Sequence, residues 1–361
     1  MTIREIGFRL CIATFSLAAS IQALAAPLSF APGHIYTTQF FSTNINEHSV
    51  DGRFLTTVSI QGLEPGEETK GIAFGPDGNL YVVLDQLFTS ARLVSVDENG
   101  AISESYALPG STGGNLSYGK LEFTDDGKVY VGTGAGIVRV QLGDPGSAQL
   151  LGAQTLDAFD VAALPGGNLL MISSYSLDEI DSDGNLVRTI ALSDPNRVSD
   201  AQFFFVNDLR GLEYDPDTDR VFVSMLGNSD NLFFVTMAFD LATGILLDIG
   251  NFTYGDDMFL AGDTLLLGSR TEAPWILSPV DLSILGRLDG AERMFVTRNV
   301  HAVVAEPGML ALMTASLLLM LAMLSARART VRRRALTQAA RVEPSSVLPA
   351  SSERVPFPDT H

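Results

Sequence analysis

The chain has 361 residues, of which 46% are hydrophobic, and a formal net charge of −19. Residues 26–305 contain 37 acidic and 14 basic side chains, so this acidic body repels nucleic acid, and no nucleic-acid partner is expected. The single cysteine, Cys11, lies in the N-terminal apolar segment, which excludes disulfides, thiolate metal sites and cysteine nucleophiles from the body.

The N-terminus has the parts of a secretory signal. Arg4 and Arg9 are followed by an apolar run up to Leu24, and Ala23-Leu24-Ala25 supplies the small residues of a cleavage site. We predict a signal peptide over residues 1–25 that signal peptidase removes, and therefore an exported protein. An uncleaved signal anchor is the alternative.

A second apolar segment lies near the C-terminus. Residues 309–326 carry no charge and, as a helix, would be about 27 Å long, near the hydrocarbon thickness of a bilayer. Arginines follow directly, beginning with Arg327 and Arg329. By the positive-inside rule they stay in the cytoplasm, so we predict one transmembrane helix that anchors an extracytoplasmic body in the inner membrane. A buried core helix is the alternative.

The flanks of this segment carry a further pattern. Glu306-Pro307-Gly308, the apolar span, and a basic cluster containing Arg332, Arg333 and Arg334 together resemble the PEP-CTERM sorting signal of Gram-negative bacteria. The resemblance covers residues 306–334 and implies processing by an exosortase-like enzyme, with delivery to the outer surface or the extracellular matrix. Ala305 replaces the usual first proline, and a tail over 335–361, rich in Ser, Pro and Ala, is predicted to be disordered. A plain membrane anchor is the alternative.

Between the two ends, residues 26–305 repeat one pattern. The clearest copy reads Gly-Ile-Ala-Phe-Gly-Pro-Asp-Gly-Asn-Leu-Tyr-Val-Val from Gly71: an apolar strand, a turn and a second apolar strand. Similar units start at Leu121, Val161, Leu212 and Met258, at spacings of 50, 40, 51 and 46 residues. A second polar turn in each unit gives four antiparallel strands, which is typical of an all-β protein with the β-propeller fold.

Residues 34–60 provide a sixth unit that lacks its first strand. Its strands are expected at Ile35–Thr38, 44–53 and 54–60, and the missing one would come from 294–304. Strands from both termini would then close a ring of six four-stranded blades and remove its edges. A seventh blade is the alternative, because residues 191–207 show no clear pattern.

Residues just before each repeat are expected to face the central channel. They are Glu67, Glu68, Lys120, Asp160, Asn207, Asp208, Arg210, Asp256 and Asp257, and His301 could approach from the closing strand. Oxygen ligands from several blades suit a divalent cation such as calcium. The alternative is that these side chains start strands, satisfy loop backbone groups and face solvent.

The Asp-Gly turns resemble those of NHL-repeat and gluconolactonase-like propellers. The second family uses a Glu, an Asn and an Asp around one divalent metal, which activates water for lactone hydrolysis. By likeness of blade position, the resemblance implies Glu68, Asn207 and Asp257 for these roles.

Two functions of different classes follow, with a structural anchor that takes no small ligand as the third. The first is a binding protein at the cell surface or in the matrix, which would hold polysaccharide, peptide or another surface protein. The second is a metal-dependent lactonase-type hydrolase. The chain has no Gly-x-Ser-x-Gly, His-Glu-x-x-His or P-loop motif, so no catalytic motif separates them.

Overall fold

The computed structural model describes residues 26–300 except for 40, 87–88, 111–119, 125, 134, 153–157, 159, 174–175, 194–208, 227–233, 252–256, 270–271 and 291–294. Contacts divide the chain into residues 1–303 and 304–361. The predicted signal peptide, sorting motif, transmembrane helix and tail lie outside the described residues. Among the residues that the structure describes, no helix is long and apolar enough to span a membrane.

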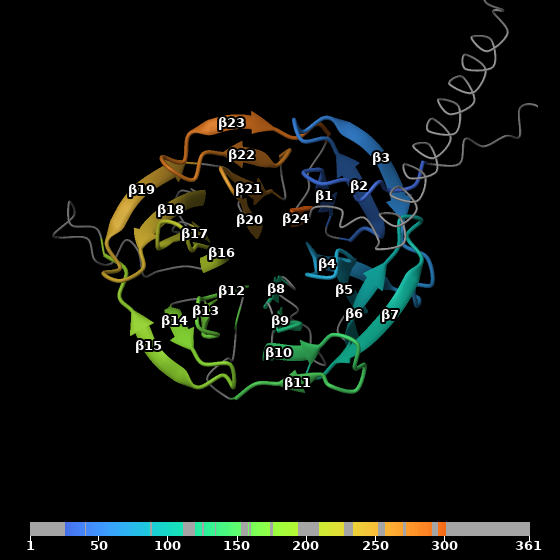
Figure 1. The fold of residues 1–361 in the computed structure, drawn as a ribbon, viewed down its shortest axis with the longest axis horizontal. Coiled ribbons are helices and arrows are strands. Elements are labelled where there is room, and N and C mark those ends of the chain that lie inside the picture. The colour runs from blue at the N-terminus through green and yellow to red at the C-terminus, as the bar shows by residue number, and fades with distance from the viewer. Residues whose placement is uncertain are drawn as a thin grey trace, which may run out of the picture. The chain divides into compact units, whose positions relative to one another are not determined.

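Twenty-four strands form six antiparallel sheets of four strands each, arranged as a ring (Figure 1). Blade 1 runs from the centre outward through β24 (Phe295–Arg298), β1 (Ile35–Thr38), β2 (Asn44–His48) and β3 (Phe54–Ser59). Blade 2 contains β4 (Glu67–Phe74), β5 (Leu80–Gln86), β6 (Ser90–Val96) and β7 (Ile102–Leu108). Blade 3 contains β8 (Leu121–Phe123), β9 (Lys128–Thr133), β10 (Gly136–Gln141) and β11 (Gln149–Leu150).

The second half of the ring repeats this order. Blade 4 contains β12 (Asp160–Ala163), β13 (Leu169–Ile172), β14 (Leu177–Ile180) and β15 (Leu186–Ile190). Blade 5 contains β16 (Leu209–Asp215), β17 (Arg220–Leu226), β18 (Phe234–Asp240) and β19 (Leu246–Asn251). Blade 6 contains β20 (Asp257–Ala261), β21 (Thr264–Gly268), β22 (Trp275–Leu277) and β23 (Ile284–Arg287).

The predicted six-bladed ring, closed by strands from both termini, is confirmed. β24 pairs with β1 in antiparallel register, with Phe295 opposite Thr38. The alternative of a seventh blade is wrong, because the six innermost strands each contact the next and complete the circle.

One strand boundary in blade 1 also needs correction. The second strand ends at His48 rather than at residue 53, because Ser49 begins a turn. The main-chain N–H of Ser49 donates to the Arg53 carbonyl, and Gly52 adopts a φ of 85° that favours glycine.

The apolar core is divided among the six blade–blade contacts. β5 illustrates why its sequence is continuously apolar. Leu80, Val82 and Leu84 pack toward blade 1, whereas Tyr81 and Val83 pack toward blade 3. Because successive side chains of a strand point to opposite faces, a blade covered on both sides needs hydrophobic residues at every position.

Candidate functional site

The predicted channel residues of blade 2 lie at the start of β4. The Glu67 carboxylate accepts hydrogen bonds of 2.6 and 2.7 Å from Arg92 of β6, so it is paired within its own blade. Glu68 lies 3.4 Å from the ammonium group of Lys70. Arg210 is the second residue of β16. Four of the other predicted positions lie outside the described residues: Asn207, Asp208, Asp256 and His301.

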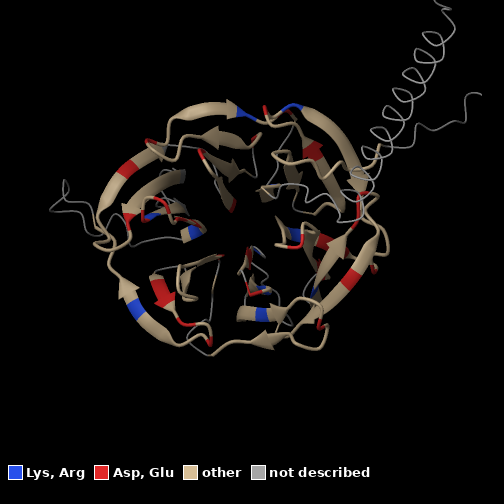
Figure 2. Cartoon of the chain, in the orientation of Figure 1, with Lys and Arg blue, Asp and Glu red and all other residues tan. Residues whose placement is uncertain are grey.

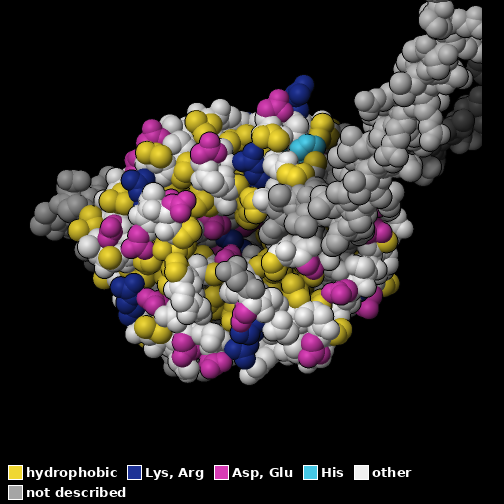
Figure 3. Space-filling view, in the orientation of Figure 1, with side chains coloured by type: hydrophobic (Ala, Val, Ile, Leu, Met, Phe, Trp, Pro, Cys, Tyr) yellow, Lys and Arg dark blue, Asp and Glu magenta, His cyan; other side chains and the backbone are white. Residues whose placement is uncertain are grey.

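Charged side chains of the innermost strands gather around Lys120, directly before β8. Its ammonium group donates to the Leu212 carbonyl and lies 3.2 Å from a Glu213 oxygen and 3.6 Å from an Asp160 oxygen. Figure 2 shows residues of both charge signs around the centre of the ring, and Figure 3 shows basic and acidic side chains together in the central hollow of the visible face. The structure therefore brings together Lys120 and Asp160, two of the predicted channel residues.

Two aspartates of this region connect neighbouring blades. Asp160, the first residue of β12, accepts a hydrogen bond of 2.6 Å from the Leu212 N–H of β16. Asp257, the first residue of β20, accepts one of 2.9 Å from the Val296 N–H of β24. Both side chains are almost fully buried. Each carboxylate thus accepts a hydrogen bond from a main-chain donor on the innermost strand of the next blade.

Burial shapes the charge of this cluster. It acts to lower the pKa of Lys120, but Asp160, Glu213, Asp257 and Glu122 together raise that pKa well above its usual value. Burial also raises the pKa of Asp257 to about 7, although Lys120 opposes the shift. One ammonium group faces four carboxyl groups, so acidic side chains outnumber basic ones in this cluster.

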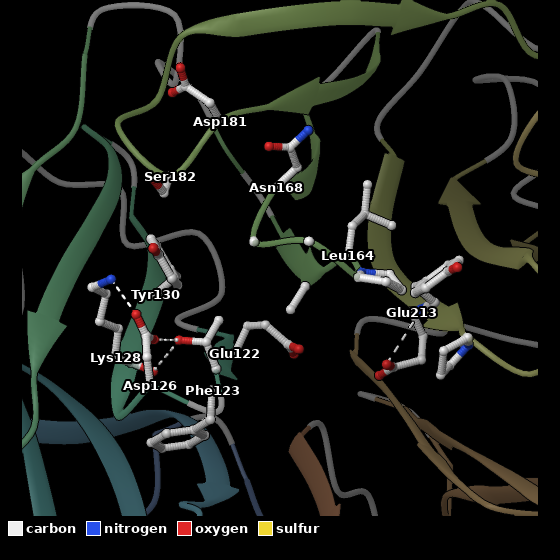
Figure 4. A pocket seen from close by; sticks show the side chains of 17 residues that line it. Glu122, Phe123, Asp126, Lys128, Tyr130, Leu164, Asn168, Asp181, Ser182 and Glu213 are labelled. Carbon is white, nitrogen blue, oxygen red and sulfur yellow. Dashed lines mark hydrogen bonds and ion pairs between the residues drawn. The ribbon is translucent and has the colours of Figure 1, made fainter.

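A cavity of about 590 Å³ opens where the innermost strands of blades 3, 4 and 5 turn into their second strands. Glu122 and Glu213 enter it from opposite sides, as Figure 4 shows. Aromatic residues also line it: Phe123, Tyr130 and Tyr214. The volume falls in the range of small-molecule sites.

The wall of the cavity near blade 3 carries a local ion pair. Lys128 donates to the Asp126 carboxylate, which also accepts a hydrogen bond of 2.6 Å from the Thr124 hydroxyl. Glu213, in contrast, belongs both to the cavity and to the Lys120 cluster. Glu213 therefore links the cavity to the Lys120 cluster.

Glu122 and Glu213 were not among the predicted site residues. Burial, and then the neighbouring Glu213, raise the pKa of Glu122 to about 8, with Lys120 and a hydrogen bond from the Ala163 N–H opposing. Their sequence signal is the repeat itself. Leu121-Glu122-Phe123 and Leu212-Glu213-Tyr214 place a glutamate between a leucine and an aromatic residue at the same position of two repeats.

The geometry also bears on the expected cation site. Across the part of the chain that the structure describes, no group of three or more His, Cys, Asp and Glu side chains is arranged to hold a metal ion. Of the three implied ligands, Glu68 and Asp257 lie on different innermost strands, β4 and β20, and Asn207 lies outside the described residues.

The solved structures that are similar to this chain share little sequence identity with it. No protein-family model and no curated protein matches the sequence. Hydrazine synthase from Kuenenia stuttgartiensis is 15% identical over 71% of this chain and 78% of that chain, with a TM-score of 0.48. The WD40 β-propeller domain of Doa1 is 15% identical over 74% and 83%, with a TM-score of 0.48. Virginiamycin B lyase from Staphylococcus aureus is 12% identical over 68% and 76%, with a TM-score of 0.44. The assignment to the propeller fold therefore rests on the strand order of this chain.

Proposed function

We propose that this chain is an exported β-propeller that binds a ligand at the cell surface or in the extracellular matrix. The observation that carries the proposal is the cavity among blades 3, 4 and 5. Carboxylates, aromatic rings and turn backbone line it together, and this combination of apolar walls with a few polar groups is typical of a recognition site.

The position of the cavity adds support. Its lining comes from turns of three different blades, at Thr124, Gly166, Ser182 and Pro216. Turns on a rigid scaffold are where binding residues concentrate, because the strands fix their position while the turn sequences can vary. A ring of six blades with separate cores provides such a scaffold.

Export and sorting belong to the same proposal. The N-terminal signal sequence, the apolar span over 309–326 and the PEP-CTERM-like motif at Glu306, Pro307 and Gly308 support it. In this view signal peptidase and an exosortase-like enzyme process the chain. Polysaccharide, a peptide or another surface protein is then the ligand.

A blocked cavity tests the binding function. Ser182 and Glu98 occupy the same position in two matching turns, since Asp181 and Asp97 each accept the N–H two residues later. Ser182→Trp would fill the cavity, and Glu98→Trp is the matched control outside it. We would probe arrays of glycans and peptides with the full chain in detergent. A ligand retained by the wild type and the control but lost by Ser182→Trp supports the proposal. Retention of every ligand by Ser182→Trp contradicts it.

The metal-dependent hydrolase is the second candidate. It is favoured by the placement of Glu68 and Asp257 on innermost strands, as a channel site requires. A metal would have to compete with the Lys70 ammonium for Glu68 and with the Val296 N–H for Asp257. A stoichiometric divalent ion, with lactone hydrolysis that a chelator abolishes, would establish this candidate.

A further inference from the structure

The acidic excess beside the cavity points to the charge of its ligand. The Lys120 ammonium group is attracted to four carboxyl groups at once: Glu122, Asp160, Glu213 and Asp257. Its nitrogen lies 3.2 Å from a Glu213 oxygen and 3.6 Å from an Asp160 oxygen. Glu122 receives only a longer-range attraction from Lys120. Glu122, with its pKa raised to about 8, is largely protonated near pH 7, and a second positive charge in the cavity would favour its ionised form and balance Glu122 and Glu213.

The donor set distinguishes an organic cation from a metal ion. Calcium requires six to eight oxygen ligands in a compact shell. Glu122 and Glu213 enter from opposite sides of a cavity of about 590 Å³, and no three-residue metal group occurs among the described residues. Two separated carboxylates with aromatic neighbours instead suit an ammonium group, through charge-assisted hydrogen bonds and contacts with aromatic faces.

The protein already binds one ammonium group in the adjoining space. The Lys120 side chain is buried there, held by the Leu212 carbonyl and the carboxylates of Glu213 and Asp160. An external ammonium group would meet carboxyl groups of the same kind at Glu122 and Glu213 in the cavity.

We infer that the cavity binds a small organic cation with a primary ammonium group, which Glu122 and Glu213 recognise. This inference rests on the proposed binding function and specifies its ligand class. The ammonium group belongs either to a free amine or to an amino sugar of a polysaccharide. Asp126 is paired with Lys128, and Asp181 accepts hydrogen bonds from Asn185 of its own turn, which leaves the carboxyl groups of Glu122 and Glu213 as the acceptors for it.

Calorimetric titration of the full chain in detergent tests the inference. The probes are 1,5-diaminopentane and glucosamine, and their neutral counterparts are 1,5-pentanediol and N-acetylglucosamine. We expect at least one amine to bind more tightly than its counterpart. Glu213→Gln should weaken binding about tenfold, because a charge-assisted hydrogen bond is lost. Asp263→Asn, an exposed acid in a blade 6 turn, is the charge-matched control and should have no effect.

Glu213→Gln also removes an ion pair of Lys120, so its effect on binding could arise indirectly. A second variant, at Glu122, avoids this problem. Glu122→Gln leaves every ion pair of the cluster in place and should likewise weaken amine binding about tenfold. Unchanged amine affinity in both variants overturns the inference, as does equal binding of the neutral counterparts or no binding of either amine.

These failures are separable from failure of the binding function itself. If a neutral ligand binds and Ser182→Trp abolishes its binding, the cavity is a binding site without ammonium recognition. If no ligand on the arrays depends on the cavity, the binding function fails together with the inference.

Discussion

Asp160 connects two blades by accepting a hydrogen bond of 2.6 Å from the main-chain N–H of Leu212. Its second oxygen accepts one of 2.7 Å from the Val161 N–H, and Lys120 lies 3.6 Å away. The carboxylate thus joins the innermost strands of blades 4 and 5 and provides a counter-charge for a buried ammonium group. Asp160, a predicted channel residue, therefore helps to hold neighbouring blades together.

We predict that Asp160→Ala lowers the free energy of unfolding by about 3 kcal/mol, since it leaves a buried N–H and part of a buried charge without a partner. Chemical denaturation measures the change. Asp160→Asn keeps one acceptor oxygen and should lose less. Asp263→Ala, at an exposed turn, is the control and should change little. Equal losses in Asp160→Ala and the control would show that the inter-blade bond contributes nothing.

Asp257 should make stability depend on pH. Its carboxyl pKa is raised from 3.8 to about 7, mainly by burial, with Lys120 and the N–H groups of Val296 and Met258 opposing and Glu213 adding to the shift. A raised pKa means that the folded state holds a proton that the unfolded state has lost. The penalty for ionisation is absent below about pH 4, grows between pH 4 and 7, and is complete above pH 7.

We therefore expect stability to fall by about 2–3 kcal/mol from pH 5 to pH 8 through this group. Asp257→Asn should flatten the profile, because the amide keeps an acceptor for Val296 but does not titrate. The midpoint of denaturation measured across this range gives the answer. A variant profile as steep as that of the wild type would assign the dependence to other groups, Glu122 first among them.

The repeat pattern predicted the fold because a blade is a local structure. The turn at Asp77-Gly78 forms as its residues suggest: Gly78 has a φ of 78°, and Asp77 accepts a 3.0 Å hydrogen bond from the Asn79 N–H. Strand ends depend on neighbours and were less predictable. The stretch 44–53 includes the turn signal Asp51-Gly52, which the predicted strand overran, and β2 stops at His48, where pairing with β3 shifts register.

The candidate site was predictable only in part, because it depends on contacts between blades. Lys120 directly precedes one innermost strand and Asp160 begins another, and the structure does bring them together. The position of Glu67 suggested the channel equally well, but Arg92, two strands away in the same blade, binds it. Glu122 and Glu213 come from blades 3 and 5, and only the closed ring shows that they share one cavity.

Chelation distinguishes the two proposed functions. We expect treatment with EDTA to leave both the fold and amine binding unchanged, because Glu122 and Glu213 need no metal to bind an ammonium group. Metal analysis of the protein before and after treatment, together with lactone assays, provides the comparison. Glu68→Gln should then have no effect on ligand binding. Loss of a stoichiometric ion together with lactone hydrolysis would favour the hydrolase instead.

The proposed signal peptide and sorting motif predict two cleavages. The mature chain should begin at Ala26 and end near Pro307, so its mass should lack both the N-terminal apolar segment and the arginine cluster. Mass spectrometry of the protein from a host with an exosortase-like system measures both ends. A mature protein that retains Arg332, Arg333 and Arg334 would instead be a permanently anchored one.

Glu47 holds the N-terminal segment against blade 1 and should be the acid-sensitive contact of the ring closure. This buried carboxylate accepts hydrogen bonds from the Ser29 N–H at 2.8 Å, the His34 ring at 2.6 Å and the Tyr36 hydroxyl at 3.0 Å. Burial alone would raise its pKa, but these donors together lower the pKa below 4.5. The stabilisation is therefore complete above the unfolded value of about 4.5 and is lost as the pH falls through the folded value.

We expect Glu47→Gln to lower the free energy of unfolding at pH 7 by about 2 kcal/mol, because a charged acceptor of several hydrogen bonds becomes neutral. The difference between variant and wild type should shrink at pH 3, where the wild-type carboxyl is also becoming protonated. Glu98→Gln, on an exposed turn, should match the wild type at both pH values. A loss in Glu47→Gln that is the same at pH 3 and pH 7 would show that packing, and not the ionised carboxylate, holds this segment.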